Sequence, residues 1–194
     1  ESQLLRYADD FVIGFQHKHE AEQVQHALSE RLAHFGLRLS AEKTQVLEFG
    51  RFAAENSMKR GEGKPPTFDF LGFTHYCSHT RDGRFALKVK TSRTRLKRSL
   101  TTVQSWLKAE RSKRPLKELW TGLTQKLAGH YQYYGISGNF ESLDKFYRRT
   151  RTLTFKWLNR RSQKKSWNWE SFQRFEHTHP LPSPKLTYAV YNTW

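Results

Sequence analysis

Two adjacent aspartates, Asp9 and Asp10, are the residues of this chain best suited by type and spacing to do chemistry. They lie between two short apolar runs, residues 4–7 and 11–13, each about long enough for a strand. This pattern predicts a tight β-hairpin with Ala8 and the two carboxylates at or beside its tip, where a turn can present both acids to one place. Mg²⁺ prefers one or two carboxylates together with phosphate oxygens, so the pair is a candidate magnesium site. The alternative is an exposed turn, in which aspartate is common.

The elements that must position this hairpin are predicted from hydrophobic periodicity. Apolar residues at helical spacing predict a helix over residues 20–35, with Gly36 as its C-cap. Alternation then predicts a strand within residues 44–49, and the polar run at 51–66, rich in Gly, Lys and Pro, predicts a loop. A further strand is predicted at 68–76 and a turn at 81–84. A strand of alternating apolar and basic residues follows at 85–90.

From residue 91 onward the apolar period changes to 3.6, which predicts three amphipathic helices. Ser92 can cap the first helix, and Asn139 can cap the third. Pro115 suits the first turn of the second helix, and Gly135 suits its end. Short connections between basic amphipathic helices predict a small bundle, so the fold class is α+β. We expect the aromatic stripes of these helices to form its core, with base-stacking platforms as the alternative.

The positive charge of the chain is concentrated in one segment. The net charge is +16; residues 1–80 hold 9 Lys and Arg against 11 Asp and Glu, whereas residues 81–165 hold 23 against 5. The last segment, residues 166–194, is neutral and aromatic. So uneven a division is typical of a protein that binds a polyanion, and it favours nucleic acid over a membrane surface.

Cysteine usage and hydropathy exclude several classes of protein. Cys77 is the only cysteine, so the chain has neither a disulfide framework nor a cysteine-rich zinc site. No apolar run is long enough for a membrane span. The pair His177 and His179 lacks further ligands and is expected to lie on the surface. We expect a reducing setting, the bacterial cytoplasm, with an organelle as the alternative.

The run Tyr7-Ala8-Asp9-Asp10 resembles the YxDD box of reverse transcriptases, and the longer string RYADDFVI is similar to the branch that includes group II intron proteins. Two further blocks follow in the order of that family. The string GLRLSAEKT at 36–44 supplies Lys43, which matches a lysine proposed to protonate the departing pyrophosphate. A surface lysine is the alternative. The string FLGF at 70–73 resembles the hairpin that holds the primer 3′ end, where Gly72 would let another backbone approach closely.

The basic helices resemble the thumb, or maturase-specific, domain of group II intron proteins. The likeness is carried by residues 119–135, which read LWTGLTQKLAGHYQYYG, and by WLNRR at 157–161. It covers about residues 4–165 in all. The resemblance therefore implies three segments: the end of a polymerase palm at 1–90, a basic helical thumb at 91–165, and an aromatic extension at 166–194.

This resemblance implies an RNA-directed DNA polymerase and intron maturase that acts with two Mg²⁺ ions on deoxynucleotides. Asp9 and Asp10 would be metal ligands, and Lys43 would serve as an acid. Contacts to the primer or nucleotide would come from the two turns, at Tyr7, Ala8, Leu71 and Gly72. The template–primer duplex and the intron RNA would be held by basic side chains at Arg93, Arg95, Lys97, Arg98, Lys126, Arg148, Arg149, Arg160 and Arg161.

Two alternative functions stay open at the level of the sequence. The protein can instead be an RNA-binding splicing maturase with polymerase activity secondary or lost, or a CRISPR-associated or domesticated reverse transcriptase. In the family, the metal site also uses an aspartate from an earlier strand. We therefore expect the chain to be the C-terminal part of a longer protein, and we expect these 194 residues alone not to polymerise DNA.

Overall fold

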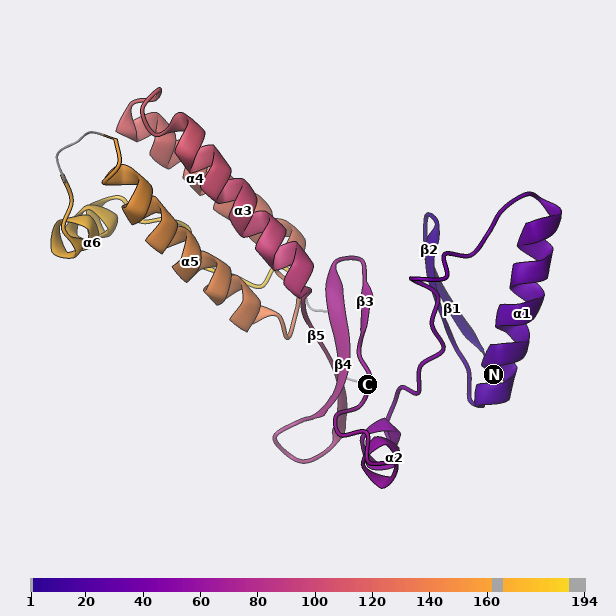
Figure 1. Cartoon of the computed structure of the whole chain (residues 1–194). Helices are drawn as coiled ribbons and strands as arrows, with labels where there is room; N and C mark the ends of the chain where they lie inside the picture. Colours follow the sequence, from indigo (N-terminus) through magenta and orange to yellow (C-terminus); the bar gives the residue numbers. More distant parts are fainter. Residues whose placement is uncertain (1, 162–165, 189–194) are drawn as a thin grey trace. The chain divides into compact units, whose positions relative to one another are not determined.

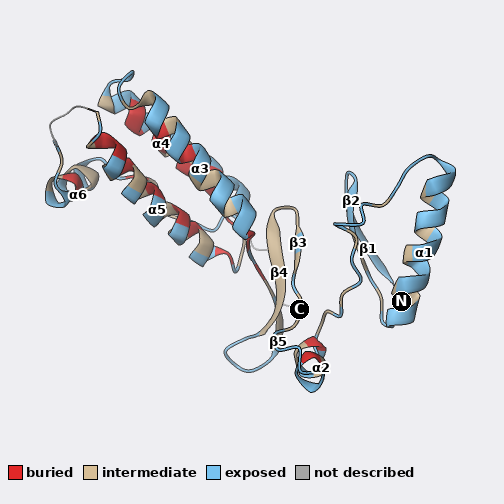
Figure 2. Cartoon of the chain, viewed as in Figure 1, coloured by how far each residue is buried: buried red, intermediate tan, exposed pale blue. Residues whose placement is uncertain are grey.

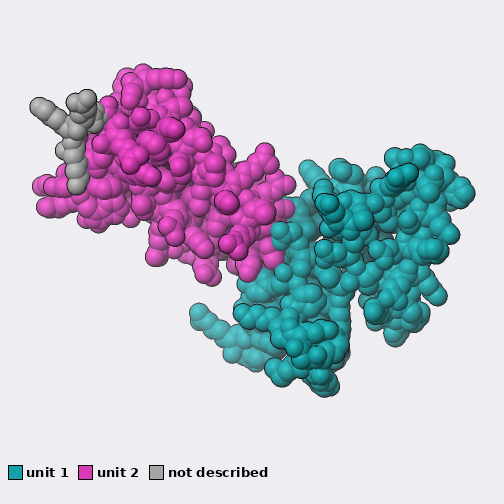
Figure 3. All heavy atoms as spheres, viewed as in Figure 1, with its two compact units in different colours: residues 1–71, 75–88 teal, residues 72–74, 89–194 magenta. Residues whose placement is uncertain are grey.

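The computed structural model describes residues 2–161 and 166–188. Within these residues, two small antiparallel sheets and six helices confirm the predicted α+β class (Figure 1). The chain divides into two compact units, one of residues 1–71 and 75–88, the other of residues 72–74 and 89–194 (Figure 3). Each unit is described below by itself.

The first unit opens with the predicted hairpin and helix. Strands β1 (Gln3–Tyr7) and β2 (Asp10–Gly14) pair antiparallel, with Tyr7 opposite Asp10. Helix α1 (Lys18–His34) follows, and the predicted cap at Gly36 is confirmed. Gly36 has a φ of +69°, and the Leu37 amide donates to the Leu32 carbonyl at 2.9 Å, which is the hydrogen bond of a Schellman motif.

Two predictions for the segment after α1 are wrong. Residues 44–49 form no strand, and the predicted loop contains helix α2 (Ala53–Lys59). A strand needs a hydrogen-bonded neighbour, and this run has none among the described strands. Its Glu48 carboxylate instead accepts hydrogen bonds from Asn56 within α2 and from Arg60 directly after it. Buried Ala53 and Ser57 give this polar helix its inward face.

The second sheet has the strand order β3 (Phe68–Phe70), β4 (Phe73–His79) and β5 (Phe85–Thr91). The structure therefore divides the predicted strand at 68–76 into two, joined by a turn at Leu71 and Gly72. Both turn residues have positive φ, +50° and +83°, as a two-residue type I′ hairpin requires. The predicted turn at 81–84 and the strand after it are confirmed.

The second unit contains the predicted helices α3 (Arg93–Glu110), α4 (Leu116–Tyr134) and α5 (Phe140–Leu158). Ser92 caps α3, because its side chain accepts from the Arg95 amide. Figure 2 shows buried residues along the facing sides of these helices. The core is made of aliphatic and aromatic side chains, among them Val103, Leu107, Leu119, Trp120, Leu123, Leu127, Tyr131, Leu143, Phe146, Trp157 and Leu158. The prediction that the aromatic stripes form core is thus confirmed for these residues.

The neutral C-terminal segment packs onto this core. Helix α6 (Trp169–Thr178) buries Phe172 completely, and Leu181 beyond it is also buried. The Trp120 indole donates to the His179 carbonyl at 3.0 Å. Arg151 on α5 forms a paired contact with Glu176 on α6, with Nε 2.7 Å from Oε1. None of the helices within the described ranges has the length and apolar content needed to cross a membrane.

Candidate functional site

The hairpin tip presents both aspartates to solvent. The register of β1 and β2 leaves Ala8 and Asp9 as a two-residue turn. Ala8 has a φ of +54°, which costs an L-residue energy and is held here partly by a 2.8 Å hydrogen bond from Arg6 Nε to the Ala8 carbonyl. A strained turn that places two carboxylates at a strand end is the kind of backbone found at functional sites.

Neither carboxylate is neutralised by the chain. Asp9 and Asp10 are exposed, and no hydrogen bond or ion pair joins their carboxylates to any of the residues that the structure describes. The flanking strands are open as well, with Leu4 and Leu5 each more than 60% exposed. The apolar strands beside the two acids are therefore exposed in the described part of this unit, and both carboxylates are open to a cation.

The donor set at the tip fits part of a magnesium site. Mg²⁺ keeps several waters and takes one or two carboxylates plus phosphate oxygens, and two adjacent exposed aspartates match that demand. Within residues 2–161 and 166–188, no cluster of three or more His, Cys, Asp or Glu could hold a metal ion. When bound, the metal would stabilise charge on the reacting phosphate. His177 and His179 are both exposed, and the His179 ring stacks on Phe175.

Lys43 lies in a turn rather than at a strand entrance. Its amide donates to the Ser40 carbonyl at 3.1 Å, as does the amide of Thr44 at 2.8 Å, so residues 40–44 form one tight helical turn. The Lys43 side chain is exposed. Its ammonium group is therefore available to a ligand, and its role as an acid stays a prediction.

The turn at Leu71 and Gly72 is anchored to the start of α3. The Ser92 amide donates to the Gly72 carbonyl at 3.0 Å. A Cβ at Gly72 would lie 3.5 Å from Arg95 Cγ and 3.6 Å from Tyr134 Oη. The sequence suggested close approach of another backbone, but the structure gives a different reason for glycine: a positive φ beside two large side chains.

The predicted basic residues fall into two groups. On α3, the side chains of Arg93, Arg95, Lys97 and Arg98 are exposed and form no ion pair within the described part of the chain. Outside α3, most of the predicted basic side chains already have a partner. Arg148 pairs with Asp144 at 2.8 Å, and Arg161 donates to the Arg114 carbonyl at 2.9 Å. Arg160 and Lys126 lie over the rings of Trp157 and Trp106. Arg149 is exposed. The α3 group is thus the more available to a polyanion.

Sequence reasoning missed His130, a buried histidine on α4. It is 8% exposed, its ring stacks on Phe146 with 3.6 Å between ring centroids, and its Nε2 has no hydrogen-bond partner among the described residues. Burial lowers the pKa of His130 to about 4. The only sequence signal was its position, three residues after Leu127 on an otherwise apolar helical face.

We expect His130 to make the chain less stable in acid. Its pKa in the folded chain lies below the value of about 6.5 in the unfolded chain, so the unfolded state binds more protons between these two values. The free energy of unfolding should therefore fall as the pH falls from about 6.5 to 4, by roughly 3 kcal/mol at most at ~1.4 kcal/mol per unit. Urea titrations over this range should show a shallower pH dependence for His130→Phe than for wild type; equal slopes would contradict the prediction.

Comparison with known families agrees with these features. Residues 1–75, which include the hairpin tip, match the family of reverse transcriptases (RNA-dependent DNA polymerases). This match indicates the reverse transcriptase family, whose members are nucleotidyltransferases. Residues 96–175, which include α4 and α5, match the maturase-specific domain of group II introns. The two matches together support a group II intron reverse transcriptase and maturase. No curated protein and no solved structure gives a significant match to the chain.

Proposed function

We propose that the protein copies RNA into DNA with Asp9 and Asp10 as ligands of the catalytic Mg²⁺, and that it also binds its intron RNA during splicing. The observation that carries the proposal is the pair of exposed, unneutralised carboxylates on a strained hairpin turn within a reverse transcriptase domain. An exposed turn without a function would give no reason to keep Ala8 at a positive φ.

Each part of the chain has its own task in this proposal. Asp9 and Asp10 hold the metal that offsets charge at the primer end, and a further carboxylate from outside the described residues completes the site. Tyr7 at the end of β1, Ala8 in the first hairpin turn, and the residues of the Leu71–Gly72 turn contact the primer and the incoming deoxynucleotide. The α3 cations and the exposed Arg149 hold phosphates of the template–primer duplex and of intron RNA, which gives affinity that depends on salt.

The experiment compares extension and splicing in a longer protein that contains this chain. Purified protein is given an RNA template with a DNA primer and deoxynucleotides in Mg²⁺, and separately its precursor intron RNA. We expect primer extension and faster splicing. Splicing without any extension would contradict the polymerase proposal and favour the alternative, a maturase whose polymerase activity is lost. Primer extension without any effect on splicing would contradict the proposed role in splicing.

A further inference from the structure

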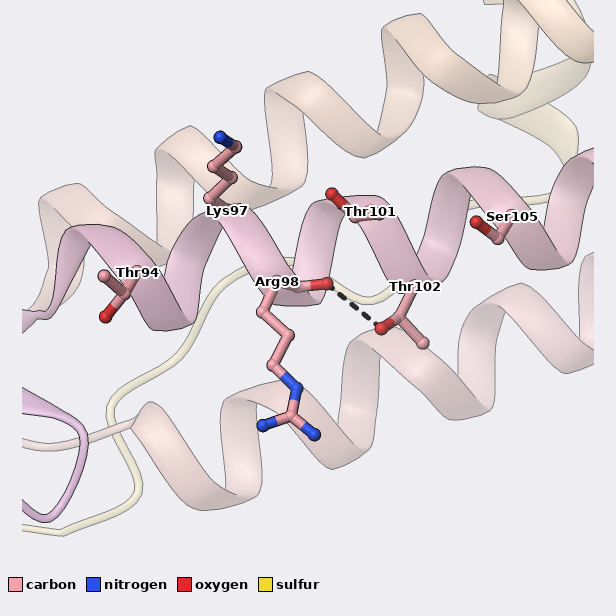
Figure 4. A pocket seen from close by; sticks show the side chains of 6 residues that line it. All are labelled: Thr94, Lys97, Arg98, Thr101, Thr102 and Ser105. Atoms are coloured by element: carbon pink, nitrogen blue, oxygen red, sulfur yellow. Dashed lines mark hydrogen bonds between the residues drawn. The ribbon is translucent and has the colours of Figure 1, made fainter.

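The exposed side of α3 carries a stripe of hydroxyl and cationic side chains with no acid among them. Figure 4 shows its six members, which are Thr94, Lys97, Arg98, Thr101, Thr102 and Ser105. They line one shallow surface hollow. They recur three and four residues apart, so they lie on one face of the helix. At ~1.5 Å per residue the stripe extends for roughly 16 Å. We call it the hydroxyl stripe.

A second hollow adjoins the hydroxyl stripe and shares Arg98 and Thr102 with it. It lies among α3, α4 and α5, with a volume of about 320 Å³. Its rim holds three cations, and its floor is apolar and aromatic; the lining residues are Arg95, Arg98, Ser99, Thr102, Val103, Lys126, His130, Tyr134 and Phe146. We call it the basic hollow. Its volume is at the low end for ligand sites, which suits one small group rather than a large cofactor.

The three cations of the basic hollow have no acidic partner. Neither Arg95, Arg98 nor Lys126 forms an ion pair with any described residue. Lys126 is fixed instead by the indole ring of Trp106, whose centroid lies 4.9 Å from its Nζ. Three like charges brought close together repel one another, so an anion between them would lower the energy of the folded chain.

A buried group of the hollow also lacks a partner. His130 Nε2 is buried and accepts or donates no hydrogen bond within the described residues. An unpaired buried nitrogen costs about 1–3 kcal/mol, so it calls for a ligand or another polar partner. Since its pKa is lowered to about 4, the ring is neutral at physiological pH, and one tautomer can donate from Nε2.

We propose that the basic hollow binds one phosphate of a nucleic-acid backbone, and that the hydroxyl stripe binds the sugar–phosphate groups next to it. This inference rests on the proposed function and gives it a particular site. Arg95 and Arg98 bind phosphate oxygens through paired N–H groups, and Lys126 supplies a point charge. The hydroxyls of Thr94, Thr101 and Ser105 donate to the neighbouring phosphate oxygens, which fixes the register without reading base sequence. The Thr102 hydroxyl instead donates to the Arg98 carbonyl at 3.0 Å.

The position of Arg95 favours the template–primer duplex as the ligand. Arg95 lines the basic hollow and also lies beside Gly72, in the turn predicted to hold the primer end. Tyr134 also lines the basic hollow, and its hydroxyl oxygen would lie 3.6 Å from a Cβ at Gly72. A backbone seated in the hollow would thus pass close to Gly72 within this unit. Folded intron RNA offers the same phosphates, so the test includes both.

The experiment measures binding of the 194-residue chain to two fluorescent probes over a range of salt. One probe is an RNA–DNA hybrid with a recessed DNA 3′ end, and the other is an RNA hairpin of equal charge. Arg95→Gln with Lys126→Gln should weaken binding to the hybrid by about 10- to 100-fold. The salt slope should fall by about 1, because the two removed cations neutralise the one phosphate that the hollow binds in the wild-type complex. If the hairpin alone is affected, the phosphate belongs to intron RNA and the choice of duplex is wrong.

A matched control removes the same charge elsewhere. Lys113 and Lys117 are exposed cations outside both hollows, so Lys113→Gln with Lys117→Gln should change affinity by about threefold or less. Equal losses in the two double variants, on both probes, would overturn the proposal and leave only diffuse attraction to a basic surface. If the wild-type chain bound neither probe, this result would contradict the proposed function itself.

A second measurement tests the part assigned to His130. His130→Phe keeps a ring on Phe146 and removes the nitrogens, so it should weaken hybrid binding a few-fold in wild type and have no effect when Arg95 and Lys126 are already changed. The Nε2 resonance in a ¹⁵N spectrum of the unaltered chain should shift when the hybrid is added. An unmoved resonance together with an additive His130→Phe effect would remove His130 from the site.

Discussion

Replacement of Asp9 by asparagine should lower primer extension by about 10³-fold in a longer protein that contains this chain. Asparagine keeps the size and shape of the side chain but cannot supply a negative oxygen to Mg²⁺. Metal stabilisation of charge in the transition state is worth several kcal/mol, and about 1.4 kcal/mol corresponds to a factor of ten in rate. The loss should appear in kcat for deoxynucleotide addition, since in the proposed site Asp9 binds the catalytic metal rather than the duplex.

Binding of the template–primer duplex should survive the same change. Asp9 is exposed and unpaired within the described residues, so its replacement breaks no contact of the fold. Affinity for duplex and for intron RNA should stay within about threefold, because removing one acid slightly reduces repulsion of phosphate. Asp82→Asn is the matched control, an exposed acid on another hairpin turn, and it should leave extension intact. If Asp9→Asn abolished binding and synthesis together, the division between hairpin chemistry and helical binding would be wrong.

The local features of this fold were predictable where one residue type dictates one conformation. Gly36 ends α1 because a left-handed residue is needed there, and Ser92 begins α3 because its side chain meets a free amide. The bundle helices were predictable because their apolar spacing is long and regular. The position of the two aspartates was predictable because the tip residues of a short hairpin must lie at or beside its turn.

The wrong predictions share a physical cause, which is dependence on partners outside the segment itself. Residues 44–49 alternate like a strand, but a strand forms only if another strand lies beside it. Helix α2 is polar and short, and it depends on Glu48, which precedes it in the chain. The basic hollow escaped prediction for the same reason: Arg95, Lys126 and His130 come from two helices, and only packing brings them together.

Asn139 gives the second large effect: its replacement by leucine should lower the free energy of unfolding by about 3–4 kcal/mol. The sequence suggested a helix cap, and Asn139 does precede α5, but its side chain forms no cap hydrogen bond. It is fully buried and joins three elements instead. Its Nδ2 donates to Thr91 Oγ1 and to the Tyr134 carbonyl, both at 2.8 Å, and its Oδ1 accepts from the Thr91 amide at 2.7 Å.

The size of this effect follows from what leucine would leave behind. The Thr91 amide and hydroxyl would stay buried without partners, each at a cost of about 1–3 kcal/mol less any relaxation, whereas the Tyr134 carbonyl would keep its 2.9 Å hydrogen bond from the Ile136 amide. A domain of this size is stable by roughly 5–15 kcal/mol, so the change should be plain in urea titration as a lower midpoint with an unchanged m-value. Gln104→Leu, at an exposed amide on α3, should change stability by less than about 0.5 kcal/mol.

A double-mutant cycle with Thr91 separates this account from simple loss of packing. Thr91→Val keeps the shape and removes only the hydroxyl, so alone it should cost about 1 kcal/mol. In the Asn139→Leu background it should cost nothing or gain stability, since the hydroxyl then has no partner. Additive effects would show that the hydrogen bond between Asn139 and the Thr91 hydroxyl does not contribute to stability. Because Thr91 ends β5 and Tyr134 ends α4, a coupling near ~1 kcal/mol would identify Asn139 as the residue that fixes the end of β5 to the bundle.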